Sequence, residues 1–221
     1  MGPYLSSATS PPLRLPRLLI AEKNFSAIEP LIRTCGDGRL DVDFDVASSP
    51  RGAVGMLLAS SYQLVISGAH LTEMEDFLLL KRTQALETFV PVVVTASASE
   101  KESARRVLEH GAFDLITTPL EHEQAVDAIR LALWESKLMT LIACKEKTLQ
   151  SYRDHIAAYP TGNEIDRTFK MTLSAIDQSI VSYQRTILRT EECTTSFSEL
   201  ATKVECYSRK RALERLDTLI H

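Results

Sequence analysis

The sequence predicts an α/β protein: a doubly wound, five-stranded parallel sheet followed by an all-α module built as a helical hairpin or a coiled coil. Short apolar runs alternate with amphipathic helical stretches between about residues 17 and 121. Strand signals vanish from His122 onward, and residues 169–187 carry an apolar seam with helical spacing. The chain has 221 residues, 44% of them hydrophobic and 24% charged, so it can bury the core of one large domain or two small ones.

The predicted strands lack a polar face, with one exception. Residues 18–21 and 64–66 are continuous apolar runs, and residues 91–95 are rich in β-branched side chains. Residues 42–46 (VDFDV) alternate strictly instead, which is typical of a half-solvated strand. The fifth run, residues 114–117, ends two residues before a proline. Strands that are apolar on both faces are expected where helices cover both sides of a parallel sheet.

Three connecting helices have recognisable sequence signals. Residues 24–34 have helical periodicity, although a proline lies among them. Ser49 followed by Pro50 supplies a capping hydroxyl and a proline suited to the first helical turn. Residues 99–102 (SEKE) match a capping box, and we expect the helix that follows to end at Gly111.

The second half is predicted to be helical. Residues 122–158 contain no proline or glycine, and at 1.5 Å per residue such a helix spans roughly 55 Å. After a turn at residues 159–163, the next helix carries apolar side chains at alternating spacings of four and three, a heptad pattern that packs one helix on another. These seam residues are Phe169, Leu173, Ile176, Ile180, Tyr183 and Ile187. A loop at 191–195 and a capping box at 196–199 introduce a last helix over 200–220.

We therefore expect three parts in the chain. Residues 1–16 form a flexible tail, residues 17–138 form the sheet domain, and residues 139–221 form a helical module that continues from the last helix of that domain. Short loops favour antiparallel neighbours, so we expect the C-terminal half to form a helical hairpin folded on or beside the long helix, which can satisfy the seam within one chain. The seam can also be shared between two chains, and a homodimer through these helices is the preferred expectation.

Composition excludes several functional classes. The formal net charge is -4, so no global basic field recruits nucleic acid or an anionic membrane. No segment approaches the roughly 18 consecutive apolar residues of a membrane span. The four cysteines, Cys35, Cys144, Cys193 and Cys206, show neither a CxxC pair nor metal-ligand spacing, which is typical of reduced thiols. The sequence also lacks a glycine-rich phosphate loop and a nucleophile elbow. We expect a cytoplasmic protein that is not an enzyme and holds no cofactor or metal.

Three segments resemble the receiver domain of bacterial two-component response regulators. They are residues 18–24 (LLIAEKN), 62–71 (YQLVISGAHL) and 111–120 (GAFDLITTPL), and the resemblance covers about residues 17–138. It implies a flavodoxin-like receiver fold and a role in phosphorelay signal transduction. Receivers hold magnesium with an acidic pair after the first strand and accept a phosphoryl group on an aspartate after the third. A hydroxyl after the fourth strand and a lysine after the fifth contact the phosphate.

The resemblance maps the metal and acceptor positions onto a degenerate pocket. The acidic pair becomes Glu22 and Lys23, so one carboxylate remains beside a cation that can stand in for magnesium. The acceptor position falls on Gly68, which has no side chain to phosphorylate. The chain is therefore predicted to be a pseudo-receiver.

The two positions that contact phosphate are also altered. The hydroxyl position falls on Ala96 if the strand is aligned by Pro91, or on Thr95 if it is aligned by the following helix. The lysine position falls on Thr118, which carries no charge. It precedes Pro119, where receivers have a cis peptide bond.

The preferred hypothesis is a phosphorylation-independent adaptor that acts through protein–protein interaction with a signalling partner. Ser67 and His70 lie near the acceptor position and are alternative phosphoryl acceptors, although nothing in the sequence activates them. A further alternative is a histidine phosphotransfer protein that uses His155.

Another alternative is a nucleic-acid-binding regulator, because the layout resembles antiterminators that join a pseudo-receiver, a long helix and a helical RNA-binding domain. Their alanine-lysine-glycine helix motif is missing here, and the nearly neutral second half argues against nucleic acid as the main ligand. The basic run at residues 209–211 is flanked by acidic residues and is predicted to form a solvated, salt-bridged helix face.

Overall fold

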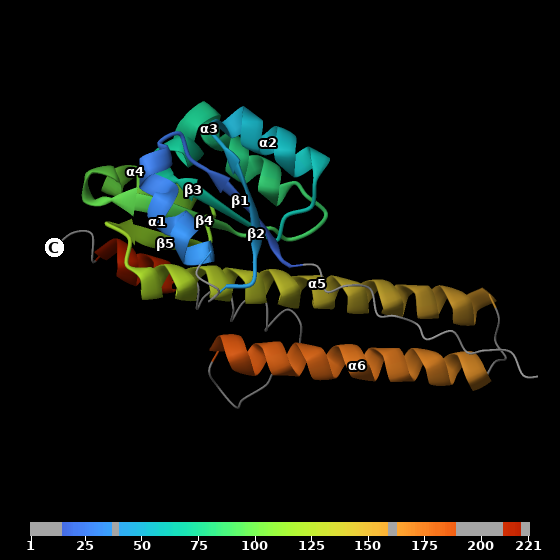
Figure 1. The fold of residues 1–221 in the computed structure, drawn as a ribbon. Helices are drawn as coiled ribbons and strands as arrows, with labels where there is room; N and C mark the ends of the chain where they lie inside the picture. The colour runs from blue at the N-terminus through green and yellow to red at the C-terminus, as the bar shows by residue number, and fades with distance from the viewer. Residues whose placement is uncertain (1–14, 37–39, 159–162, 189–209, 218–221) are drawn as a thin grey trace, which may run out of the picture.

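Figure 1 shows the computed structural model, which describes residues 15–36, 40–158, 163–188 and 210–217. Five parallel strands form one sheet in the order β2-β1-β3-β4-β5. The strands are β1 (Arg17–Ala21), β2 (Asp43–Ala47), β3 (Leu64–Gly68), β4 (Val92–Ser97) and β5 (Asp114–Thr118). The predicted five-stranded parallel sheet is confirmed, and each strand begins and ends within two residues of its expected bounds.

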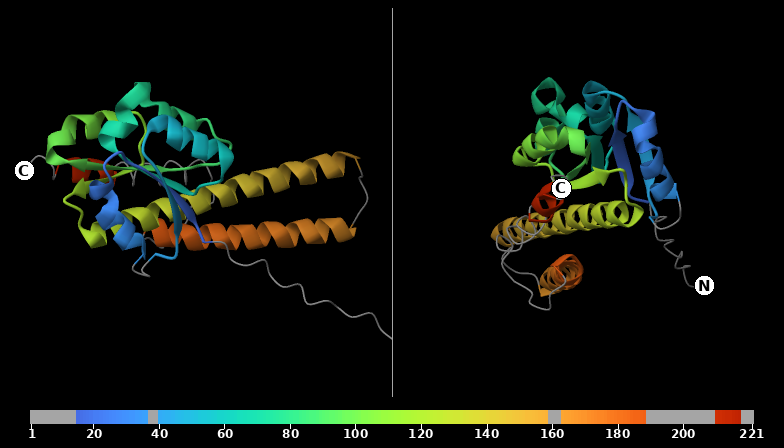
Figure 2. Two further views of the ribbon diagram at one scale, coloured as in Figure 1. Left: turned by 45° about the horizontal axis from the view of Figure 1, so that its top comes forward. Right: turned by 90° about the vertical axis from the view of Figure 1, so that its left-hand side faces the viewer.

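Helices cover both faces of this sheet (Figure 2). The helices on one face are α1 (Phe25–Gly36) and α5 (His122–Ala158); those on the other are α2 (Pro50–Ala59), α3 (Ala69–Gln84) and α4 (Lys101–Glu109). The doubly wound arrangement follows, and it explains why most strands have no polar face.

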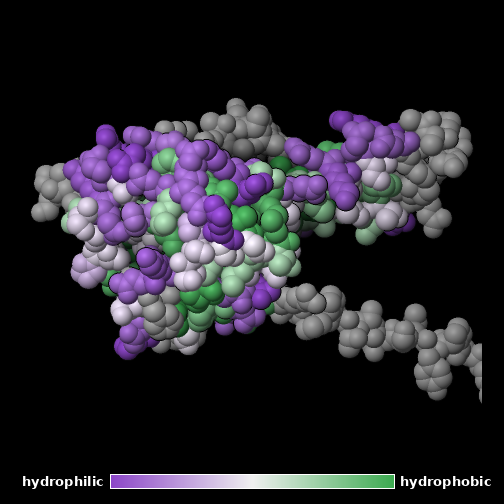
Figure 3. All heavy atoms as spheres, turned by 90° about the horizontal axis from the view of Figure 1, so that it is seen from above, coloured by the Kyte–Doolittle hydropathy of each residue, from purple (hydrophilic) through white to green (hydrophobic). Residues whose placement is uncertain are grey.

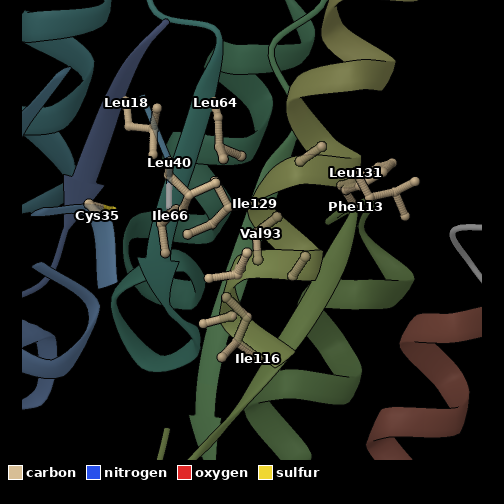
Figure 4. Close-up of a cluster of buried hydrophobic side chains, with 14 of the residues drawn as sticks. Leu18, Cys35, Leu40, Leu64, Ile66, Val93, Phe113, Ile116, Ile129 and Leu131 are labelled. Atoms are coloured by element: carbon tan, nitrogen blue, oxygen red, sulfur yellow. The ribbon is translucent and has the colours of Figure 1, made fainter. Parts of the chain in front are cut away.

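Alternation of side chains along the strands divides the core in two. Leu18 and Ile20 of β1 belong to the cluster that includes α1 and α5, whereas Leu19 and Ala21 belong to the cluster with α2, α3 and α4. Figure 4 shows the first cluster, in which Ile129 of α5 lies against the side chains of the strands. Ile129 is fully buried, so α5 is an integral part of the sheet domain.

The sequence signals at α1 and α2 are confirmed. Helix α1 contains Pro30, as expected from the sequence. Ser49 is the N-cap of α2, and its hydroxyl accepts a hydrogen bond from the backbone N–H of Gly52 at 3.1 Å. Pro50 occupies the first turn, where the missing N–H costs no intrahelical hydrogen bond.

The predicted capping box at residues 99–102 is wrong by two positions. β4 continues to Ser97, and this last residue of the strand forms the box with Glu100. The Glu100 carboxylate accepts a hydrogen bond from the Ser97 N–H at 3.0 Å. The box encloses a single 3₁₀ turn at Ala98–Glu100, and α4 begins at the next residue. Helix α4 ends at Glu109, and Gly111 follows with a φ of +100°, a conformation that glycine adopts without strain.

Helix α3 is interrupted by three consecutive residues in the left-handed region. Glu75, Asp76 and Phe77 have φ values of +52°, +57° and +58°, which cost about 1–2 kcal/mol per residue for L-amino acids. The turn is held from both sides, because Arg51 of α2 pairs with Glu75 at 2.9 Å and the Phe77 ring stacks on His110 at 3.7 Å. The second half of α3 is thereby redirected within the α2–α3–α4 layer.

The long helix and its neighbour form a helical hairpin. Helix α5 spans the predicted residues, and α6 (Asn163–Leu188) runs back along it (Figure 1). Lys145 of α5 and Asp177 of α6 form an ion pair, and the rings of Tyr152 and Phe169 lie 4.8 Å apart. The structure therefore pairs α6 with the long helix α5 itself, whereas the sequence predicted a separate helical hairpin folded on or beside that long helix.

The predicted seam contributes to this packing. Ile180 is buried in the cluster that contains α5, Ile176 packs against it, and Phe169 and Leu173 are half-buried. The side chains of Tyr183 and Ile187 lie outside the described residues. Sharing of the seam between two chains stays a prediction.

Residues 210–217 form a further helix beside β5 and the first turns of α5 (Figures 1 and 2). The predicted tail is described only at Leu15 and Pro16, and the predicted loop at 191–195 and capping box at 196–199 lie outside the described residues. Among the helices that the structure describes, none combines the length and apolar character needed to cross a membrane.

Candidate functional site

The residues predicted for the phosphoryl pocket gather at the carboxyl ends of the strands. Gly68 is the last residue of β3, and Thr118 is the last residue of β5. Glu22 directly follows β1, and its N–H donates to the carbonyl of Ala47 at 2.9 Å. A parallel sheet offers its ligand sites at this edge.

The carboxylate of Glu22 occupies the space that a side chain at position 68 would fill. A Cβ atom built on Gly68 would lie 2.0 Å from Oε2 of Glu22, far inside contact distance. The other oxygen of Glu22 accepts a hydrogen bond from the Asn24 N–H at 3.0 Å, which holds the carboxylate over the glycine. The acceptor position is thus filled by the carboxylate of the residue that follows β1. The sequence did not predict this contact.

The register of β3 and β4 bears on the choice between Thr95 and Ala96. Gly68 pairs with Thr95, so these two residues are direct neighbours across the sheet. Ala96 is buried in the cluster with α2, α3 and α4. The geometry therefore favours Thr95 as the residue at the hydroxyl position.

The end of β5 keeps the backbone geometry implied by the resemblance. The Thr118–Pro119 peptide bond is cis, as expected. The preceding residue, Thr117, donates from its hydroxyl and its N–H to the side-chain oxygen of Gln124 at 2.9 Å and 3.1 Å. This contact ties the strand end to the first turn of α5, although no charged group is present at Thr118.

The pocket does not fit a magnesium ion. Magnesium requires several hard oxygen ligands in octahedral geometry, and the mapped positions offer the carboxylate of Glu22 beside the exposed cation Lys23. Among the described residues, no group of three or more His, Cys, Asp or Glu side chains could hold a metal. A stand-in role for Lys23 stays a prediction.

The alternative phosphoryl acceptors differ in exposure. Ser67 is buried, at 1% exposure, and its hydroxyl lies 3.4 Å from the carbonyl oxygen of Gly68. His70 is exposed, and the side chain of His155 lies outside the described residues. Burial of Ser67 hinders attack on a phosphodonor from solution.

A second polar cluster, absent from the sequence predictions, lies at the start of β5. Asp114 is fully buried, and its carboxylate accepts from Arg215 at 2.8 Å and from Arg211 at 3.5 Å. The Leu115 N–H also donates to this carboxylate, at 2.8 Å. Burial raises the pKa of Asp114, while the two guanidinium groups and the Leu115 N–H oppose that shift.

The sheet, its helices and the pocket together define the fold of a response-regulator receiver domain. No protein-family model matches the chain. The transcriptional regulatory protein ZraR of Escherichia coli K12 is 28% identical to it over 88 residues, and ZraR of Salmonella typhimurium is 26% identical over 88 residues. Each match covers 40% of this chain and only 20% of the relative.

Solved structures agree with this assignment of the fold. The signal receiver domain of a Luxo repressor protein from Vibrio parahaemolyticus aligns with a TM-score of 0.51 and 22% identity, over 59% of this chain and 98% of that one. The signal receiver domain of an HD domain-containing protein from Pseudomonas fluorescens Pf-5 aligns with a TM-score of 0.50 and 19% identity, over 59% and 95%. At these identities the likeness shows the fold alone.

The contact between Glu22 and Gly68 predicts a strong coupling between the two positions. Gly68→Ala should lower the free energy of unfolding by about 1 kcal/mol, because the new Cβ displaces the carboxylate from its hydrogen bond. In the Glu22→Ala background the same change should be neutral or stabilising, since Gly68 has φ -57° and ψ 138°, which alanine adopts readily. Urea unfolding of the four chains measures the coupling.

Gly55→Ala is the matched control, because nothing lies within 4 Å of a Cβ at that position. It should not lower the stability. Additive effects of Glu22→Ala and Gly68→Ala would contradict the observed contact.

Proposed function

We propose that this chain is a phosphorylation-independent pseudo-receiver, an adaptor in two-component signalling that acts through protein–protein interaction. One observation carries the proposal: Gly68 stands at the acceptor position, and the carboxylate of Glu22 fills the space beside it. The receiver fold and the likeness to ZraR support the signalling class.

The remaining pocket residues support the same reading. A receiver needs a metal and a cation to stabilise the charge of the transferred phosphoryl group. Here the pocket does not fit magnesium, and the position of the cation is held by the uncharged Thr118. The domain keeps the receiver fold, but the mapped pocket lacks the metal ligands and the cation that phosphoryl transfer requires.

The link to the helical module supports an adaptor role. Helix α5 packs on the sheet through Ile129 and continues without a break into the hairpin with α6. A partner that docks on the receiver-like domain can therefore influence the helical module directly. We propose that the sheet domain binds a signalling partner and that α5 connects the two parts.

The test is the intact mass of the full chain after incubation with magnesium and acetyl phosphate. We expect no change in mass, while a receiver domain with an intact acceptor aspartate gains one phosphoryl group under the same conditions. A stoichiometric phosphoryl adduct would overturn the proposal. Ser67→Ala, His70→Ala and His155→Ala would then identify the acceptor, and loss of the adduct in the last variant would favour histidine phosphotransfer.

A further inference from the structure

A groove of about 1290 Å³ lies between the amino ends of β1 and β2 and the middle of α5. Figure 1 shows the start of β2 beside this helix. β2 is the edge strand opposite β5, and no other strand of the described residues pairs with its outer side. The phosphoryl pocket lies at the carboxyl ends of the strands, so the groove is a separate site.

Apolar side chains from two elements line this groove. Val42 and Phe44 come from the start of β2, and Leu133 and Trp134 come from α5. All four are half-buried and pack against the cluster that contains α1 and α5. Aromatic rings that are partly accessible in a groove are typical binding surfaces for proline-rich, extended segments. The groove therefore suits an extended segment with prolines rather than another helix.

The charges of the groove are divided between its two sides. Asp41 and Asp43 at the start of β2 are exposed, while Asp45 is already paired with neighbouring side chains of the domain. The α5 side contributes Arg130 and Lys137 instead. A segment that fits this arrangement carries a cation near β2 and no charge where it crosses α5.

The chain itself enters this groove. Leu15 and Pro16 line it, and the carbonyl of Pro16 accepts a hydrogen bond from the Asp43 N–H at 2.9 Å. Residues 1–14 precede this fixed point, and their sequence contains three prolines and one charged side chain, Arg14. Two extended residues span up to about 7 Å, so Arg14 can reach the carboxylates at the start of β2.

The length of this segment is sufficient to cross the groove. Fourteen residues in the polyproline II conformation extend about 43 Å at 3.1 Å per residue. The part of α5 that lines the groove is about 15 Å long. Attachment at Leu15 holds the segment at an effective concentration in the millimolar range, so contacts too weak to bind a free peptide can suffice.

We propose that residues 1–14 bind in this groove as an extended segment of the same chain. Arg14 lies beside the carboxylates of Asp41 and Asp43, and residues 11–13 (PPL) cross Trp134. Prolines lower the entropic cost of ordering such a segment, because they restrict it before it binds. The bound segment connects β2 to α5 and braces the helix that joins the sheet domain to the hairpin.

Trp134 is the only tryptophan of the chain and lines the groove, so its fluorescence reports whether the groove is occupied. The experiment measures quenching by acrylamide in the full chain and in a released chain with Pro11→Ser, Pro12→Ser and Leu13→Ser. The released chain should be quenched at least about twofold more strongly, because the segment no longer shields the indole.

The matched control carries three substitutions at polar positions of the same segment, Ser6→Ala, Ser7→Ala and Thr9→Ala. Its quenching should equal that of the unchanged chain, and circular dichroism checks the fold of every variant. Equal quenching of the released and unchanged chains would overturn the proposal.

A second set of variants tests the position of Arg14. Arg14→Asn, and separately Asp41→Asn with Asp43→Asn, should each increase the quenching. All three substitutions together should increase it no further than the larger of these effects, because both remove the same contact. Fully additive increases would overturn the placement of Arg14 beside these carboxylates.

Dilution tests whether the segment belongs to the same chain. Quenching of the unchanged chain should stay constant over about a hundredfold range of concentration, since intramolecular binding does not depend on concentration. Quenching that increases on dilution would indicate a segment supplied by a second copy and would overturn the assignment. None of these outcomes depends on phosphorylation, so the adaptor proposal and this one can fail separately.

Discussion

Alkylation of the folded chain with iodoacetamide at pH 8 should modify Cys144 at least about 100-fold faster than Cys35. Cys35 is 4% exposed, in the cluster formed by α1, α5 and the strands, and burial raises the pKa of its thiol from 9.0 to about 11. A pKa that is higher by about two units reduces the thiolate fraction of Cys35 about 100-fold relative to its ordinary pKa. Steric protection of the buried sulfur slows its reaction further. Cys144 is exposed on α5 and has no comparable burial.

Peptide mapping by mass spectrometry measures the two rates separately and distinguishes them from those of Cys193 and Cys206. The same reaction in about 8 M urea, which unfolds most domains, is the control and should bring the two rates together. Equal rates for Cys35 and Cys144 in the folded chain would contradict the placement of α1 on the sheet.

Ile129→Ala should lower the free energy of unfolding by about 2–5 kcal/mol, the cost of removing a buried aliphatic side chain and leaving a cavity. Ile129 is fully buried between α5 and the strands. Because α5 belongs to both halves of the chain, the loss should weaken the sheet domain and the attachment of the hairpin together.

The matched control is Leu58→Ala on α2, where the side chain is 73% exposed. This change should alter stability by less than about 0.5 kcal/mol. Urea unfolding followed by circular dichroism compares the two variants. A loss below about 1 kcal/mol for Ile129→Ala would show that α5 does not complete the core.

Local patterns were sufficient for most of the fold. Apolar runs without a polar face predicted the strands, and the uninterrupted stretch from His122 to Ala158 predicted α5. The capping box failed because two overlapping S-x-x-E patterns, at Ser97 and Ser99, satisfy the same local rule. The length of β4 decides between them, and that length is fixed by pairing with β3 and β5. Figure 3 shows apolar side chains beside hydrophilic ones on one face of the molecule, so surface composition alone does not mark the site.

The contacts that define the two polar sites could not be predicted from local sequence. Glu22 and Gly68 are brought together by the pairing of β1 with β3. Arg215 reaches Asp114 across 101 residues of sequence. The basic run at 209–211 was expected to be solvated, which agrees with the exposed Lys210 but is wrong for Arg211, because that side chain turns toward the buried carboxylate.

Helix α5 is continuous from the sheet to the tip of the hairpin, so a rotation at the sheet displaces its far end. Ile142 is its last residue within the buried cluster, and from there to Ala158 the helix extends about 24 Å. A tilt of about 10° at the sheet would carry the far end through about 4 Å, which is comparable to one helical turn of 5.4 Å. A small reorientation caused by a bound partner would therefore be magnified along the helix, and the tip of the hairpin is where we expect such a movement to be largest.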